Sequence, residues 1–76
     1  MKEFLHYLLS LICDYPEKID IKESQISDSN FSYLITADQS DIGKIIGKGG
    51  KIIQAVRNIA KIIAVKENIK IRIDVV

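Results

Sequence analysis

The sequence has few of the residues that build disulfides, metal sites and catalytic centres. Its 76 residues include one cysteine, one histidine, one proline and no tryptophan. A single thiol, Cys13, excludes an internal disulfide, and His6 alone cannot form a Cys/His metal cluster. The acidic residues are scattered through expected turns and strand edges, without a paired-carboxylate or nucleophile–base pattern. The sequence therefore predicts no catalytic residues, no metal site and no cofactor.

Long apolar runs and targeting signals are also missing. Glu3, His6 and Ser10 interrupt the apolar residues near the N-terminus, and no small-residue cleavage site follows them. No segment reaches the length that spans a membrane. Together with the lone cysteine, this predicts a cytoplasmic protein. The length and an apolar content of 47% predict one domain, residues 1–76, with a modest core.

The sequence has almost no excess of either charge overall, but its positive charges are concentrated in one segment. The net charge is only +1, yet residues 1–41 hold eight acids and three lysines, whereas residues 42–66 hold six cations and no acid. The basic segment predicts a polyanionic partner with a small footprint rather than a broad nucleic-acid surface. A solvated helix surface is the alternative for some of these cations, which are Lys44, Lys48, Lys51, Arg57, Lys61 and Lys66.

The most specific local pattern is Gly47-Lys48-Gly49-Gly50, a Gly-x-x-Gly sequence between two apolar helical patterns. Gly47 and Gly50 have no side chain to hold a phosphate away, and both are expected to take positive φ in a sharp turn. The following helix begins with free N–H groups and a partial positive charge, and Lys48 and Lys51 add cations. This predicts the phosphate clamp of a KH-type RNA-binding module. The alternative is an ordinary helix corner capped by Gly47, and the spacing fits neither a P-loop nor a dinucleotide fingerprint.

Hydrophobic spacing along the chain predicts the order αββααβ and an α+β fold. Helices are expected over residues 2–13, from Asp38 or Ser40 to Ile45, and over residues 50–65. Strands are expected over residues 19–26, 31–36 and 69–75, and the short polar link at residues 27–30 implies an antiparallel hairpin between the first two.

Residues 15–19, 40–48 and 55–59 resemble the KhpA family of small bacterial single-KH proteins, which have type II KH topology. The likeness runs end to end and implies one KH domain, with a three-stranded sheet covered on one face by three helices. It also implies a cleft for about four single-stranded nucleotides, and either self-association or pairing with a larger KH protein of the KhpB type. Two departures predict weaker binding: Gly49 stands where the family often has a bulkier polar residue, and Gln54 where lysine is common.

The predicted binding site surrounds the glycine motif. Phosphates are expected to meet the backbone of residues 47–50, while bases lie on Ile45, Ile46 and Ile53; the alternative for each isoleucine is the core, which is favoured for Ile46. Tyr33 and Phe31 are expected to pack under the helices, so sequence specificity should be shallow. The residues assigned to RNA binding are Lys44, Ile45, Ile46, Gly47, Lys48, Gly49, Gly50, Lys51, Ile53 and Arg57.

The long predicted helix is apolar over a wider arc than one core requires. Its expected core stripe is Ile52, Val56, Ile59 and Ile63. One flank of this helix, either Ile53, Ala60 and Ala64 or Ala55 and Ile62, is expected to face the nucleotide groove. Part of the remaining apolar surface is expected to contact a second chain. The alternative is that the first helix and the sheet cover all of this apolar surface.

Two functions follow from these observations. The first is a non-catalytic single-stranded RNA-binding protein, an RNA chaperone or post-transcriptional regulator, with single-stranded DNA as an open alternative. The second is an interaction module that acts through homo- or heterodimerisation in the regulation of cell growth or division.

Overall fold

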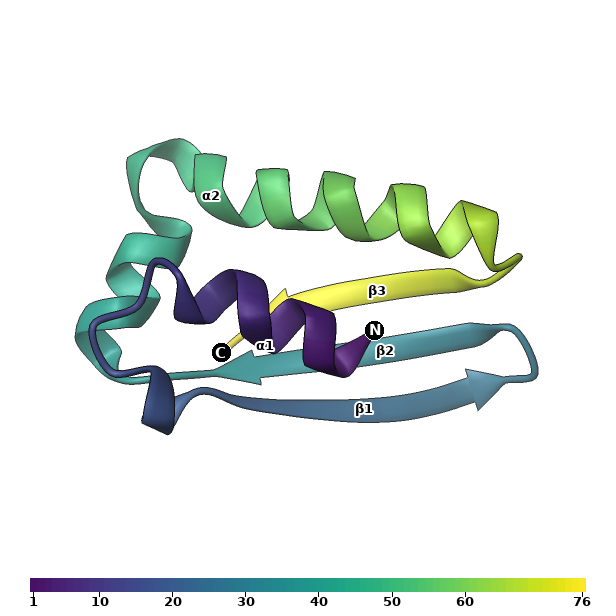
Figure 1. Cartoon of the computed structure of the whole chain (residues 1–76), viewed down its shortest axis with the longest axis horizontal. Coiled ribbons are helices and arrows are strands. Elements are labelled where there is room, and N and C mark those ends of the chain that lie inside the picture. The colour runs from purple at the N-terminus through teal and green to yellow at the C-terminus, as the bar shows by residue number, and fades with distance from the viewer.

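A three-stranded sheet carries helices on one face in the computed structural model, which describes residues 1–47 and 49–76 (Figure 1). The described part of the chain contains no helix with the length and apolar character needed to cross a membrane. The elements in chain order are α1 (Lys2–Ser10), the short 3-10 helix η1 (Pro16–Lys18), β1 (Asp20–Ser27), β2 (Asn30–Thr36), α2 (Gln39–Lys66) and β3 (Lys70–Val75).

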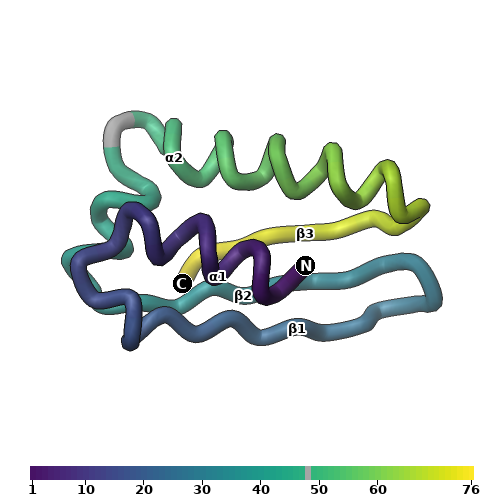
Figure 2. Tube along the Cα trace, in the orientation of Figure 1, coloured from purple at the N-terminus to yellow at the C-terminus, as the bar shows by residue number. Residues whose placement is uncertain are grey.

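Helix α2 is bent into two arms by a turn within the glycine motif (Figures 1 and 2). Gly49 and Gly50 have φ values of 73° and 72°, which do not belong to a right-handed helix. The two arms and α1 supply the three helices of the predicted αββααβ order. The α+β class and the element order predicted from the sequence are therefore confirmed.

The sheet has the strand order β1-β2-β3, with β1 antiparallel and β3 parallel to β2. The predicted hairpin between β1 and β2 is confirmed, with a register shift between Gln25 and Ser27. A parallel neighbour cannot be reached through a tight turn, so the chain needs a crossover between β2 and β3. Helix α2 is that crossover, and its long second arm lies beside β3 (Figure 1).

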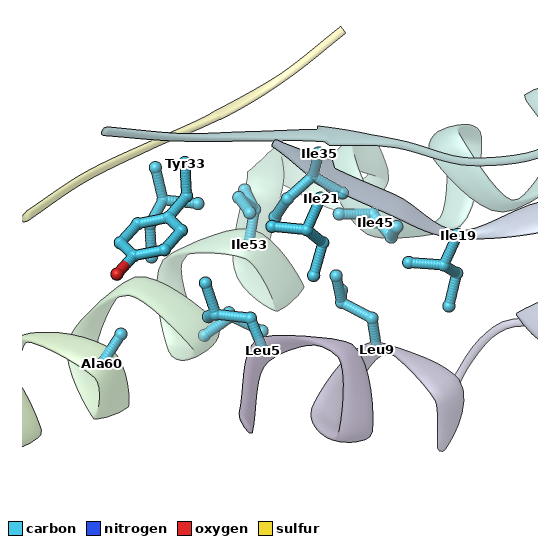
Figure 3. Close-up of a cluster of buried hydrophobic side chains, with 11 residues drawn as sticks. Leu5, Leu9, Ile19, Ile21, Tyr33, Ile35, Ile45, Ile53 and Ala60 are labelled. Carbon is cyan, nitrogen blue, oxygen red and sulfur yellow. The ribbon is translucent and has the colours of Figure 1, made fainter. Parts of the chain in front are cut away.

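The core lies between the sheet and the helices (Figure 3). Alternation along the strands turns Ile21, Tyr33 and Ile35 toward the helices, where they meet Leu5 and Leu9 of α1. Tyr33 is only 2% exposed, and Phe31 packs against the same cluster. The prediction that both aromatic residues lie under the helices is confirmed.

Helix α1 ends at Ser10, three residues before its predicted end. The N–H of Cys13 still bonds to the carbonyl of Leu9, but the N–H groups of Asp14 and Tyr15 donate to the Asp41 side chain instead of to helix carbonyls. The conformation required before Pro16 also opposes a longer helix. Tertiary contacts thus end the helix earlier than its apolar spacing suggests.

The second arm of α2 buries a different stripe from the predicted one. Ile59, expected at the centre of the core, is 42% exposed, and Ile52 and Ile63 are only partly buried. The predicted stripe was therefore wrong except for Val56. Small side chains let the arm approach β3 and the core closely, so the buried face is Ile53, Val56, Ala60 and Ala64.

Two leucines at the end of α1 provide a test of this core. Leu9→Ala should lower the free energy of unfolding by about 2–5 kcal/mol, because Leu9 is fully buried and its removal leaves a cavity. Leu11→Ala is the matched control: Leu11 is 65% exposed, so the change should stay within about 0.5 kcal/mol. Urea unfolding monitored by circular dichroism measures both. Equal losses would contradict the described packing of α1.

Candidate nucleic-acid interface

The backbone turn within the glycine motif is formed by Gly49 and Gly50. Positive φ was expected at Gly47 and Gly50, and the structure confirms it only for Gly50. Gly47 keeps a φ outside the left-handed region, because the first arm of α2 continues through it, and Gly49 takes the second positive φ instead. Lys48, also assigned to the site from the sequence, lies outside the described residues.

The backbone at this turn is open to an approaching ligand. A Cβ atom added at Gly47 or Gly49 would meet no atom within 4 Å. At Gly50 it would meet only the Ile53 side chain, at an ordinary contact distance of 3.6 Å. Lys51 follows immediately and is exposed at the start of the second arm. The turn therefore combines an accessible backbone, a helix start and a cation, which together favour an anion.

The three isoleucines assigned to the base-binding floor differ sharply in burial. Ile45 is fully buried and Ile53 is 5% exposed, so both belong to the core. Ile46, for which the core was favoured, is 50% exposed, and that interpretation was wrong. The reason is the direction of the first arm: Ile45 faces the sheet, and its neighbour therefore points away from it. Ile46 is the isoleucine that a ligand at the turn can reach.

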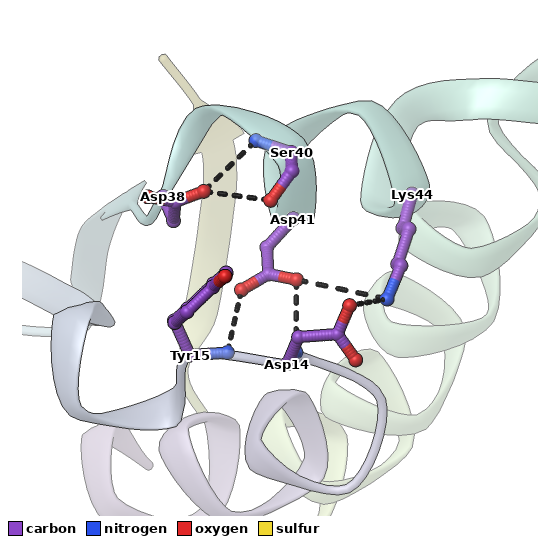
Figure 4. A network of polar contacts seen from close by, with 6 residues as sticks. All are labelled: Asp14, Tyr15, Asp38, Ser40, Asp41 and Lys44. Carbon is purple, nitrogen blue, oxygen red and sulfur yellow. Dashed lines mark hydrogen bonds and ion pairs between the residues drawn. The ribbon is translucent and has the colours of Figure 1, made fainter.

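Lys44 is held in a network of carboxylates rather than presented to a ligand (Figure 4). Its ammonium group forms an ion pair with Asp14 and lies 3.9 Å from Oδ1 of Asp41. The hydrogen bond to Asp14 is the main reason why the pKa of Lys44 is raised. Asp38 caps the same arm by accepting from the Ser40 N–H at 3.1 Å, which confirms a predicted N-cap.

A groove of about 730 Å³ lies between the second arm of α2 and β3. Its floor is apolar, and charged side chains from both elements surround it. Four of these charges are cations and one is an acid, so the groove is the basic concavity expected for a polyanion. The lining residues are Arg57, Asn58, Lys61, Ala64, Val65, Ile69, Lys70, Ile71, Arg72, Ile73 and Asp74.

Arg57 links the two walls of this groove. Its Nε and Nη2 atoms donate to the Ile73 carbonyl at 3.0 and 2.8 Å. The carbonyl of Ile73 therefore points toward α2, whereas the N–H of Lys70 points the other way and donates to Ser29 at 2.7 Å. In an extended strand, alternate residues direct their backbone groups to opposite edges. Ile71 thus turns its N–H and C=O toward the groove, along the free edge of the sheet.

The structure separates the predicted site residues into three places. Gly47, Gly49, Gly50 and Lys51 lie at the turn with Ile46, and Arg57 lies about 10 Å further along the second arm. Ile45 and Ile53 lie in the core, and Lys44 belongs to the carboxylate network.

Several groove residues were not assigned from the sequence. Lys61 was considered only as a helix-surface lysine, although its position four residues after Arg57 places both on one side of the helix. Lys70, Ile71 and Arg72 carried no local signal, because their place depends on β3 lying beside the second arm of α2. Nothing in the sequence signalled the burial of Asp41, which is 0% exposed.

Comparison with known proteins bears on this site. The family model described as "KhpA/KhpB, KH domain" matches residues 2–75. A protein of Chlamydia trachomatis serovar D named RNA-binding protein KhpA is 39% identical over 75 residues, covering 99% of this chain and 95% of the relative. A protein of the same name from Clostridium perfringens is 30% identical over 76 residues, covering 100% of both chains. No solved structure matches this chain at a significant level.

The two kinds of glycine in α2 should respond oppositely to alanine. Gly50→Ala should lower the free energy of unfolding by about 1–2 kcal/mol, because alanine is strained at a φ of 72°. Gly43 lies in the first arm without positive φ and with open space around it, so Gly43→Ala should raise stability by about 0.5–1 kcal/mol. Urea unfolding of both variants measures the difference. A loss of stability in Gly43→Ala as large as in Gly50→Ala would contradict the turn geometry.

Proposed function

This chain belongs to the KhpA/KhpB family of KH-domain proteins, and we propose that it binds single-stranded RNA and catalyses no reaction. The observation that carries the proposal is the basic, apolar-floored groove between the second arm of α2 and β3, on the same arm that begins at the open glycine turn. The name of the relatives, RNA-binding protein, supports the same ligand.

The glycine turn would hold the RNA phosphates. Gly47 and Gly49 leave the backbone uncovered, so a phosphate can approach the N–H groups at the start of the second arm. Lys51 adds a positive charge there, and Lys48 is assigned to the same role from the sequence alone. The contact is to the backbone of the nucleic acid and therefore carries no sequence information.

The groove would hold the bases. Ala64, Ile69 and Ile71 supply apolar contact, and the free N–H and C=O of Ile71 can pair with a base edge. Such pairing requires unstacked, unpaired bases, so the ligand is a single strand rather than a duplex. No aromatic side chain lines the groove among the described residues, which limits stacking and makes recognition shallow. Weak, broad binding suits an RNA chaperone or post-transcriptional regulator in the cytoplasm.

Electrostatics favour a modest affinity. Arg57 is committed to the Ile73 carbonyl and Arg72 to the Asp74 carboxylate, at 3.0 Å. Within the described ranges, the cations at the turn and groove with neither an ion pair nor a hydrogen bond to the protein are Lys51, Lys61 and Lys70. Three phosphate contacts correspond to a slope of about −2 in log affinity against log salt concentration for a single strand.

A second role, self-association or pairing with a KhpB-type KH protein, rests on the outer face of α2. Ile59 and Ile62 are 42% and 62% exposed, and Ala55 lies exposed one turn before them on the same face. None of the three lines the groove. Dimerisation through this stripe (Ala55, Ile59 and Ile62) would leave the groove accessible, so protein pairing and RNA binding can occur together.

Charge reversal at two lysines of α2 tests the RNA site. Lys61→Glu should weaken binding to a fluorescein-labelled single-stranded RNA by about tenfold and make the salt slope shallower by about 0.7, since a phosphate contact is lost. Lys66→Glu is the matched control, because Lys66 is exposed on the same helix but does not line the groove. Fluorescence anisotropy at several salt concentrations measures both values. Equal effects of the two substitutions would reject the groove as the binding surface.

Substitution in the outer stripe tests self-association. Ile59→Glu should convert a dimer that forms at micromolar concentration into a monomer, because a carboxylate would be desolvated in the interface. Ile26→Glu is the control, since Ile26 is 67% exposed in β1, away from α2. Sedimentation over a roughly hundredfold concentration range, with and without RNA, reports the state. A wild-type protein that stays monomeric throughout would reject the homodimer, and dissociation by RNA would place the contact at the groove instead.

A further inference from the structure

The side chain of Asp41 is fully buried, and the proposed RNA contacts do not use it. Its Oδ1 and Oδ2 atoms accept hydrogen bonds from the N–H groups of Asp14 and Tyr15, each at 2.9 Å (Figure 4). The Lys44 ammonium lies 3.9 Å from Oδ1 and pairs with the Asp14 carboxylate. A carboxylate in the first arm of α2 thus holds two consecutive N–H groups of the connection between α1 and η1.

The first arm of α2 has little intrinsic stability. It extends from Gln39 to the turn at Gly49, which is fewer than three helical turns, and isolated helices shorter than about 12–15 residues are marginal in water. It also contains Gly43 and Gly47, and glycine disfavours a helix interior. The Asp38 side chain accepts from one of its first N–H groups, that of Ser40, but does not set the direction of the arm. Contacts with the rest of the molecule must therefore set that direction.

Two fully buried side chains make those contacts. Ile45 and Asp41 are each 0% exposed, and their spacing of four residues places them on one face of the arm. Ile45 makes non-directional apolar contact, which permits the arm to tilt or rotate. The two hydrogen bonds of Asp41 are directional, and breaking one would leave a poorly solvated N–H without a partner. Of the two, Asp41 is the contact that can fix orientation.

We propose that Asp41 is a positioning residue for the RNA site: it fixes the first arm against the connection after α1 and so sets where the glycine turn presents its backbone. The inference rests on the proposed RNA-binding function. Lys44 lies 3.9 Å from this carboxylate and forms an ion pair with Asp14, so it helps to hold the first arm in the same orientation. The turn begins about 12 Å further along the arm, at Gly49, so a small tilt at Asp41 is carried directly to the phosphate contact.

Asp41→Asn is the test, because it keeps the size of the side chain but replaces one acceptor oxygen with an NH2 donor. One of the two N–H groups then faces a donor, and the arm should reorient. The dissociation constant for a fluorescein-labelled single-stranded RNA should rise by about tenfold. In the absence of RNA, the amide NMR shifts of Gly47, Gly49 and Gly50 should move. Both measurements are made on the full chain, at a temperature where circular dichroism shows it folded.

Leu5→Ala is the matched control for lost stability, since Leu5 is fully buried in α1 but takes no part in the hydrogen bonds of Asp41. Compared equally far below its own melting temperature, it should keep wild-type affinity and unchanged glycine shifts. Equal loss of affinity in both variants, or wild-type affinity and unmoved glycine signals in folded Asp41→Asn, would overturn the positioning role. A wild-type protein that fails to bind RNA would overturn the proposed function instead, and the glycine shifts would still decide whether Asp41 sets the turn.

Discussion

Two parallel neighbouring strands cannot be joined by a tight turn, and much of this structure depends on that constraint. After β2, the chain must return along the length of the sheet before β3 can begin in the same direction. The second arm of α2 makes the return, and its 16 residues, 51–66, span about 24 Å at the rise of an α-helix. The first arm leads the chain off the end of β2, so a sharp turn must join the arms, and Gly49 and Gly50 make it.

The same crossover creates the groove. A helix that runs back beside the last strand leaves one strand edge unpaired, and that edge faces the helix instead of another strand. Ala60 and Ala64 are small enough for a close approach, and Arg57 links the helix to the edge through the Ile73 carbonyl. The proposed base contacts at Ile71 and the cations Lys61 and Lys70 therefore arise from one topological requirement. The glycine turn lies at the start of the same arm, about 10 Å before Arg57.

Some cations of this chain form ion pairs within the fold and others are available to a ligand, and the composition does not show which are which. Lys44 belongs to the basic segment, yet its charge is used to balance Asp14 and Asp41. Arg72 is similarly paired with Asp74. A locally basic segment thus presents fewer available cations than its composition suggests, which is consistent with a binding protein of small footprint.

The sequence by itself determined the order of the elements, the hairpin, an N-cap at Asp38 or Ser40 and a turn within the glycine motif, because these depend on local spacing, glycine and capping chemistry. It also identified the KH family through residues that lie close together along the chain. It did not determine which isoleucine near the turn is exposed, since apolar spacing shows how wide a helix face is and not which part meets the sheet. Only the tertiary structure decided that Ile45 is buried and Ile46 is exposed, that the second arm turns Ala60 and Ala64 inward, and that Lys70 and Arg72 border the groove. The burial of Asp41 was decided there as well, because its partners are N–H groups 26 and 27 residues away, and a contact over that distance leaves no periodic signal in the sequence.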